Sequence, residues 1–180
     1  HLRTRRQRQM CIRDRIGGSD CSGDAGIQAD LHAVNYYNIS GHKIHGSTVI
    51  TAITAQNSNA VKSIFNIKPE LIKDQIDCIF KEKKIHAIKT GMLCNEETVE
   101  TIYKSIARRK TKLIIDPVIA STSGTKLITD SGLEKLKELL LPKAFMVTPN
   151  LEEIKILTGI EANDRISMIK AGTKLLEYGC

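Results

Sequence analysis

The amino-acid sequence predicts an α/β fold with a mostly parallel central sheet and helices on both of its faces. Short β-branched segments alternate with amphipathic segments of about ten to fifteen residues, which is the pattern of βαβ units. The segment 47–56, STVITAITAQ, is apolar on both alternating faces, as expected of a strand covered on two sides. The apolar share of 41% is ordinary for a chain that buries a real core.

The same patterns place the individual elements in order along the chain. Proline suits the first turn of a helix, and Asn, Asp or Ser side chains can cap the free N–H groups at its start. Behind these residues Ile, Leu and Val recur at helical spacing, and Lys, Pro or Gly marks the helix ends. The predicted strands span 47–56, 85–89, 112–115 and 145–148, and the predicted helices begin at Pro69, Asn95, Asp130 or Ser131, Asn150 and Asp164.

Residues 1–15 differ in composition from the rest of the chain. The whole chain has a net charge of +7. Residues 1–15 hold six arginines and one Asp, whereas the remaining residues carry 21 basic and 19 acidic groups. A basic footprint confined to a short arm argues against nucleic-acid binding by the folded domain. The arm has no apolar period, so we expect residues 1–15 to be non-native linker or adapter sequence, or alternatively a disordered basic tail. The folded domain is expected at 16–180.

The five cysteines are odd in number and widely spaced. No CxxC pair or Cys/His cluster is present, which argues against structural zinc and a disulfide framework and favours a reducing, cytoplasmic setting. No uncharged run is long enough to cross a bilayer, and we expect no membrane partner. Because the chain stops at Cys180 directly after an amphipathic segment, we expect it to be a fragment of a longer protein.

Glycine, amide, carboxylate and proline residues gather where the predicted strands end. In open parallel sheets ligands bind beyond the carboxyl ends of the strands, so these residues predict one shared site. The segments concerned are the glycine-rich 17–30, then Gln56, Met92 after Gly91, Asp116, and 148–153.

Each of these residues has an interpretation as part of a site and a structural alternative. The amide of Gln56 suits the edge of a heterocycle, or it bonds a neighbouring loop. Met92 offers a polarizable surface to a flat ring, or it simply packs in the core. The oxygens of Asp116 and Glu153 suit Mg²⁺ bound to nucleotide phosphates. Asn150 and Glu153 also have the spacing of a helix capping box.

Five segments taken in order resemble one family: GSDCSGDAGIQAD, VITAITAQN, IKTGML, IIDPV and TPNLEE. They are similar to those of the hydroxymethylpyrimidine/phosphomethylpyrimidine kinases, which are ribokinase-like enzymes of thiamine biosynthesis. The resemblance covers residues 16–180 and implies a three-layer α/β/α fold whose C-terminal part is missing. It also implies phosphorylation of 4-amino-5-hydroxymethyl-2-methylpyrimidine and its monophosphate with ATP and Mg²⁺, and it allows a homodimer of the full-length protein.

The resemblance also assigns roles to residues. Those implied around the pyrimidine substrate are Gly18, Asp30, Gln56, Met92 and Val118. Those implied near the metal and the nucleotide are Asp116 and Glu153 for Mg²⁺, and Asn150 and Glu153 for ATP. The family's Gly-Thr-Gly-Cys anion hole is expected downstream of Cys180. We therefore expect no catalytic residue within this chain, and at most weak pyrimidine binding by the fragment.

One departure and two alternatives accompany the resemblance. The family's first strand is apolar, whereas charged Arg13-Asp14-Arg15 stands in its place here. One alternative is a pyridoxal or pyridoxine kinase of the same superfamily, and Gln56 with Met92 is the reason for preferring the pyrimidine. The other alternative is a non-catalytic pyrimidine-binding module.

Overall fold

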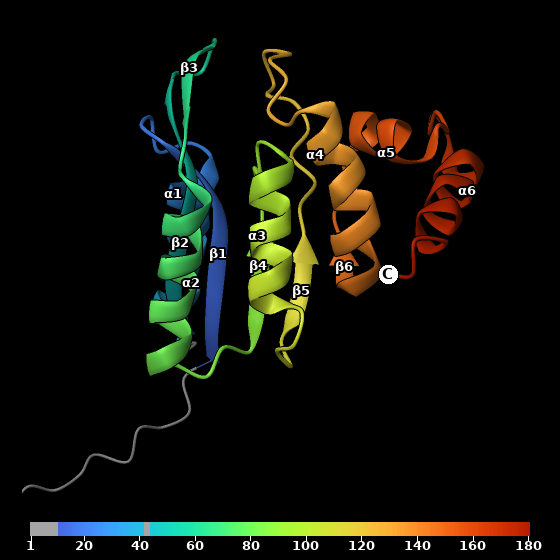
Figure 1. Ribbon diagram of the computed structural model, residues 1–180. Helices are drawn as coiled ribbons and strands as arrows, with labels where there is room; N and C mark the ends of the chain where they lie inside the picture. Colours follow the sequence, from blue (N-terminus) through green and yellow to red (C-terminus); the bar gives the residue numbers. More distant parts are fainter. Residues whose placement is uncertain (1–10, 42–43) are drawn as a thin grey trace, which may run out of the picture.

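A six-stranded sheet forms the centre of the computed structural model, which describes residues 11–41 and 44–180. The strand order is β3-β2-β1-β4-β5-β6, and every neighbouring pair is parallel except β2 and β3 (Figure 1). This confirms the predicted mostly parallel sheet. The strands are β1 (Cys11–Asp20), β2 (Ile44–Gln56), β3 (Val61–Asn66), β4 (Ala87–Thr90), β5 (Lys112–Ile115) and β6 (Ala144–Val147).

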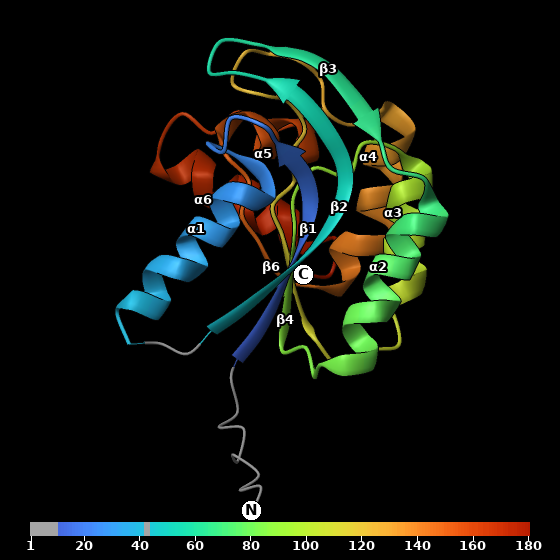
Figure 2. The same cartoon turned by 90° about the vertical axis from the view of Figure 1, so that its left-hand side faces the viewer.

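Helices cover both faces of this sheet. Figure 2 shows α1 on one face and α2, α3 and α4 on the other, which is the predicted three-layer arrangement. The helices are α1 (Gly26–Ile39), α2 (Pro69–Glu82), α3 (Glu96–Ile106), α4 (Asp130–Lys135), α5 (Leu151–Thr158) and α6 (Arg165–Leu176). A π-helical turn at Leu136–Leu140 and a 3-10 turn at Leu141–Lys143 extend α4 toward β6. No helix among the described residues is long and apolar enough to cross a membrane.

The sequence signals at the helix ends are confirmed. Pro69 occupies the first turn of α2. The Asn95 side chain accepts a hydrogen bond from the main-chain N–H of Thr98 at 3.0 Å and so caps α3. Asp164 caps α6 in the same way. Gly159 follows α5 with φ 76°, the left-handed conformation that glycine adopts without a steric penalty.

The main hydrophobic core lies between the sheet and the α2–α4 layer. Ile72 and Ile76 of α2 and Val99 and Ile102 of α3 are almost completely buried against it. A second, smaller cluster lies beside the ends of the strands and consists of Ala52, Met92, Cys94 and Leu127. We call these four residues the rim cluster. Its position matters because it forms part of the wall of the candidate site.

The expected domain boundary at Ile16 requires a correction for residues 11–15. β1 begins at Cys11 and pairs from there with β2, and from Arg13 with β4. Parallel ladders are made by backbone groups, so charged side chains do not prevent a strand from occupying the centre of the sheet. Asp14 is only 2% exposed, and this burial raises the pKa of its carboxyl. Residues 1–10 of the expected arm lie outside the described residues.

The strand β3 was not predicted. It pairs antiparallel with β2 and forms an edge of the sheet. The turn between them is closed by Asn57, whose Oδ1 accepts hydrogen bonds from the main-chain N–H groups of Asn59 and Ala60. Most residues of β3 are exposed, so the segment lacks the apolar alternation that identifies a half-buried strand.

Candidate ligand-binding site

A cavity of about 390 Å³ lies at the carboxyl ends of β1, β2, β4 and β5. Parallel strands end at one edge of a sheet, so residues far apart in sequence meet there. Six of the residues singled out from the sequence line this cavity: Gly18, Asp30, Gln56, Met92, Asp116 and Val118. The structure therefore brings together every predicted substrate-binding residue and one of the two predicted metal ligands.

The glycine-rich segment after β1 forms a tight turn over one side of the cavity. A Cβ atom on Gly26 would lie 2.3 Å from the carbonyl oxygen of Gly18, and Gly26 has a φ of 61°. A Cβ on Gly18 would lie 3.1 Å from the sulfur of Met92. Gly26 requires glycine because of its backbone conformation and because a Cβ would meet the backbone, whereas a Cβ on Gly18 would need the Met92 side chain to shift. The backbone of this turn is consequently exposed to the cavity.

Asp20, at the end of β1, organises this turn. Its carboxylate accepts hydrogen bonds from the N–H and hydroxyl of Ser22, at 2.8 and 2.7 Å, and from the N–H of Ala25 at 2.9 Å. Burial raises the pKa of Asp20, but these bonds and one from the Gln56 side chain outweigh that effect and hold the pKa below its usual value. Asp20 is therefore an ionised anchor for the loop.

Gln56 ends β2 at the wall of the cavity. The thiol of Cys21 donates a hydrogen bond to its carbonyl oxygen at 3.2 Å, and its main-chain N–H donates to the same sulfur at 3.4 Å. Its side-chain amide carries two N–H donors, so one can bond Asp20 while the other and the carbonyl oxygen remain for a ligand. Gln56 therefore lines the cavity, and its main chain bonds the neighbouring loop through Cys21.

Apolar side chains form another part of the wall. Met92 is 7% exposed and packs in the rim cluster, against which Val118 also lies. The hydroxyl of Thr51 donates to the carbonyl oxygen of Met92 at 2.6 Å and fixes the backbone at that position. A cavity bounded by a thioether and a valine offers a surface suited to a flat ring.

Charged side chains gather at a different part of the cavity. The Nζ of Lys89 lies 3.1 Å from Oδ1 of Asp30 and 3.0 Å from Oδ2 of Asp116. Arg15 adds a longer contact to Asp30, at 3.9 Å. Lys89 was not among the predicted site residues, although the sequence carries one signal: a lysine near the end of the predicted strand 85–89, just before Gly91. We call Lys89, Asp30 and Asp116 the charged triad.

Asn150 and Glu153 do not line the cavity. They form the capping box of α5: Oδ1 of Asn150 accepts from the N–H of Glu153, and Oε2 of Glu153 accepts from the N–H of Asn150, both at 2.9 Å. Glu153 is 6% exposed. Burial raises the pKa of Glu153 and the charge of Asp116 adds to this rise, although the bond from Asn150 opposes it. Glu153 and Asp116 thus face the same region from two elements.

The chain was compared with known protein families and sequences. A family model described as phosphomethylpyrimidine kinase matches residues 20–180. A hydroxymethylpyrimidine/phosphomethylpyrimidine kinase of Streptomyces coelicolor is 37% identical over 164 residues, which cover 91% of this chain. The chain spans 59% of the length of that curated relative.

Solved structures give the same result for the fold. Phosphomethylpyrimidine kinase from Clostridium difficile superimposes with a TM-score of 0.82 at 35% identity, over 94% of this chain and 71% of that one. An ADP complex of Bacillus subtilis pyridoxal kinase gives a TM-score of 0.83 at 32% identity, over 96% of this chain and 64% of that one. With the family model matching most of its length, the chain belongs to the phosphomethylpyrimidine kinase family.

Proposed function

We propose that the protein carrying this chain transfers phosphate from ATP to 4-amino-5-hydroxymethyl-2-methylpyrimidine, and then to the monophosphate, in thiamine biosynthesis. The observation that carries the proposal is the position of Gln56. It ends β2 at the wall of a cavity that is also lined by Met92 and Val118. A flat ring with a donor and an acceptor on one edge matches this combination of an amide and apolar walls.

In the proposed complex the ring lies against Met92 and Val118, beside the backbone of Gly18. The carbonyl oxygen of Gln56 accepts a hydrogen bond from the 4-amino group, and its remaining N–H donates to the adjacent ring nitrogen. Asp30 accepts a hydrogen bond from the hydroxymethyl group. The charged triad already places the Asp30 carboxylate at the cavity wall, which supports this role.

We also propose that Asp116 and Glu153 face Mg²⁺ and the phosphates of ATP. Two observations support a cation-binding site here. A carboxylate oxygen of Asp116 pairs with the ammonium group of Lys89, and the charge of Asp116 contributes to the raised pKa of Glu153. Mg²⁺ keeps several waters, so two carboxylates suffice, and when bound it neutralises phosphate charge. Among the described residues no group of three acidic, His or Cys residues could hold a metal alone.

Asn150 has a more indirect place in this proposal. Its side chain caps α5, and the same bonds hold the Glu153 carboxylate in position. We propose that Asn150 contributes to the nucleotide site through this arrangement of the α5 start.

The second candidate is phosphorylation of pyridoxal, which the likeness to a pyridoxal kinase favours. The test uses the complete gene product with ATP and Mg²⁺ and measures ADP release. We expect release with the hydroxymethylpyrimidine and with its monophosphate. Release with pyridoxal but with neither pyrimidine would select the second candidate. Pyrimidine binding without any ADP release would select a non-catalytic binding module.

We further propose a cytoplasmic location and a homodimer of the full-length protein. ATP as the phosphate donor and the free thiols of Cys21, Cys78, Cys94 and Cys180 support the location. Sedimentation of the complete gene product tests the assembly, and a monomeric mass at micromolar concentration would contradict it.

A further inference from the structure

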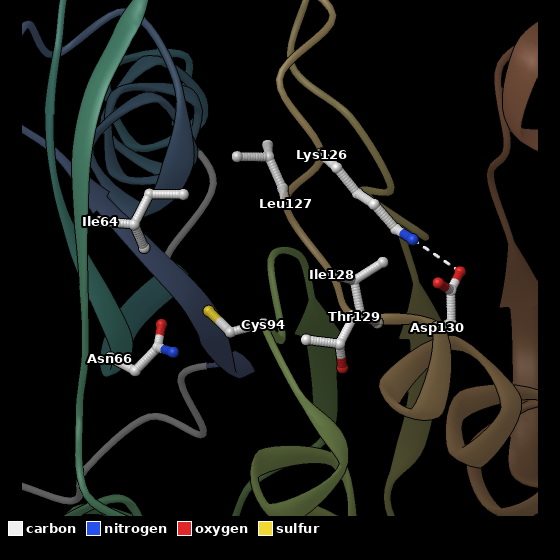
Figure 3. A pocket seen from close by; sticks show the side chains of 8 residues that line it. All are labelled: Ile64, Asn66, Cys94, Lys126, Leu127, Ile128, Thr129 and Asp130. Atoms are coloured by element: carbon white, nitrogen blue, oxygen red, sulfur yellow. Dashed lines mark hydrogen bonds and ion pairs between the residues drawn. The ribbon is translucent and has the colours of Figure 1, made fainter.

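Two cavities of the protein share one side chain as their common wall. The second cavity, of about 400 Å³, lies between β3 and the segment 126–130. Leu127 lines both this cavity and the candidate ligand-binding site. In Figure 3, Ile64 and Asn66 of β3 face Cys94 and Leu127 across the second cavity, while Lys126 turns away to pair with Asp130.

Leu127 is held firmly in this position. It is 9% exposed and packs in the rim cluster with Ala52, Met92 and Cys94. Its main-chain N–H donates to the carbonyl oxygen of Ile119 at 2.8 Å. The segment around it is fixed further by single β-bridges from Lys126 to Ala120 and from Ile128 to Cys94. Packing of this kind makes the side chain a fixed partition.

We propose that Leu127 sets the length of the group that the substrate can carry at position 2 of its pyrimidine ring. This inference rests on the proposed function. Positions 2 and 5 lie opposite each other on a pyrimidine ring. In the proposed complex the hydroxymethyl group of position 5 lies at the charged triad, and we place the group at position 2 toward Leu127, which lines the same cavity.

Shortening Leu127 would open the partition and join the two cavities. The second cavity offers apolar surface from Ile64 and Ile128, so a chain of methylene groups could be buried there. Each buried methylene is favourable, whereas a chain that meets a fixed wall is rejected. The wild-type protein should therefore bind short 2-alkyl groups, and a variant with a smaller residue 127 should accept longer ones.

The experiment measures binding of four 4-amino-5-hydroxymethylpyrimidines by calorimetry, with 2-methyl, 2-ethyl, 2-propyl and 2-butyl groups, to the complete gene product. One methylene in an apolar pocket changes affinity by roughly 10-fold or more. In the wild-type protein we expect affinity to fall by about that factor when the chain reaches Leu127. In Leu127→Ala we expect the 2-butyl compound to bind about 10-fold tighter than to the wild type, and the 2-methyl compound to bind more weakly.

Two further variants keep the result interpretable. Ile64→Ala enlarges only the second cavity, because Ile64 does not line the first, and should leave the wild-type order unchanged. Leu127→Val removes less volume than Leu127→Ala, so it serves as the test if Leu127→Ala does not fold. It should move the chain length at which affinity falls toward the 2-ethyl or 2-propyl compound.

Three results bear on the inference in different ways. A uniform loss of affinity across the series in both Leu127 variants would overturn it, and so would equal relief in Ile64→Ala. If the wild-type protein binds the 2-methyl compound but the Leu127 variants show the same order of affinities across the series, only the role of Leu127 fails. If the wild-type protein binds no member of the series, the proposed function fails as well.

Discussion

Replacing Lys89 by methionine would remove the ammonium group that lies between two carboxylates at the cavity. The Nζ atom contacts Asp30 at 3.1 Å and Asp116 at 3.0 Å. Methionine has a similar length and no charge, so the apolar stem of the side chain remains packed. The two carboxylates would then face each other without the cation between them.

The cost follows from the charges that remain. Hydrogen bonds to charged groups contribute about 1.5–3 kcal/mol each. The contacts of 3.1 and 3.0 Å to Nζ allow at most about 6 Å between the two bonded carboxylate oxygens, and at that distance two unit charges repel by about 3 kcal/mol at an effective dielectric constant of 20. The three side chains are only 22–32% exposed, so solvent screens these terms in part. After that discount we expect Lys89→Met to lower the free energy of unfolding by about 1–3 kcal/mol at pH 7.

Urea unfolding of wild type and variant at pH 7 measures this effect. Lys126→Met is the matched control, because its pair with Asp130 is on an exposed helix start and should contribute about 0.5 kcal/mol or less. A Lys89 effect no larger than that of the control would refute the reasoning.

Three further changes test other parts of the account. Gln56→Leu should weaken binding of the hydroxymethylpyrimidine by about 10- to 100-fold in calorimetry, because two hydrogen bonds to the ring edge are lost. Gly26→Ala should lower the thermal midpoint, because its Cβ would meet the carbonyl oxygen of Gly18 at 2.3 Å. Asp14→Asn should raise the midpoint at neutral pH. The folded pKa of Asp14 lies above its ordinary value, so wild-type stability falls as the pH rises through the interval between the two values, and the variant lacks this loss.

Each of these predictions has a clear contrary result. Unchanged affinity in a folded Gln56→Leu protein would remove the amide from the site. Gly23→Ala is the control for Gly26→Ala, since Gly23 also has a positive φ but nothing lies within 4 Å of its added Cβ. Equal losses in the two glycine variants would show that only the backbone conformation matters. An Asp14→Asn protein that gains no stability above the wild type at any pH would contradict the burial argument.

Local rules predicted the elements that have strong caps and apolar faces. The strand 112–115 and the starts of α2, α3, α5 and α6 lie where the sequence placed them. β3 was missed because an exposed edge strand is specified by pairing with β2 rather than by its own pattern. The start of the folded domain was expected at Ile16, whereas the ladders of β1 with β2 and β4 include the charged residues 13–15.

The site was predictable to the extent that it follows from strand ends. Gln56, Met92 and Asp116 meet because parallel strands converge at one edge. Lys89 and Leu127 escaped prediction because their roles depend on contacts across the cavity and not on a motif. The role of Lys89 follows from the two carboxylates that it joins, and that of Leu127 from the two cavities that it separates.

A crystal structure of the complete gene product with bound 4-amino-5-hydroxymethyl-2-methylpyrimidine tests the central claim most directly. The account predicts the ring against Met92 and Val118, with its amino edge within hydrogen-bonding distance of the Gln56 side chain and its hydroxymethyl oxygen beside Asp30. A ring bound outside this cavity, or one whose amino edge faces away from Gln56, would contradict the account.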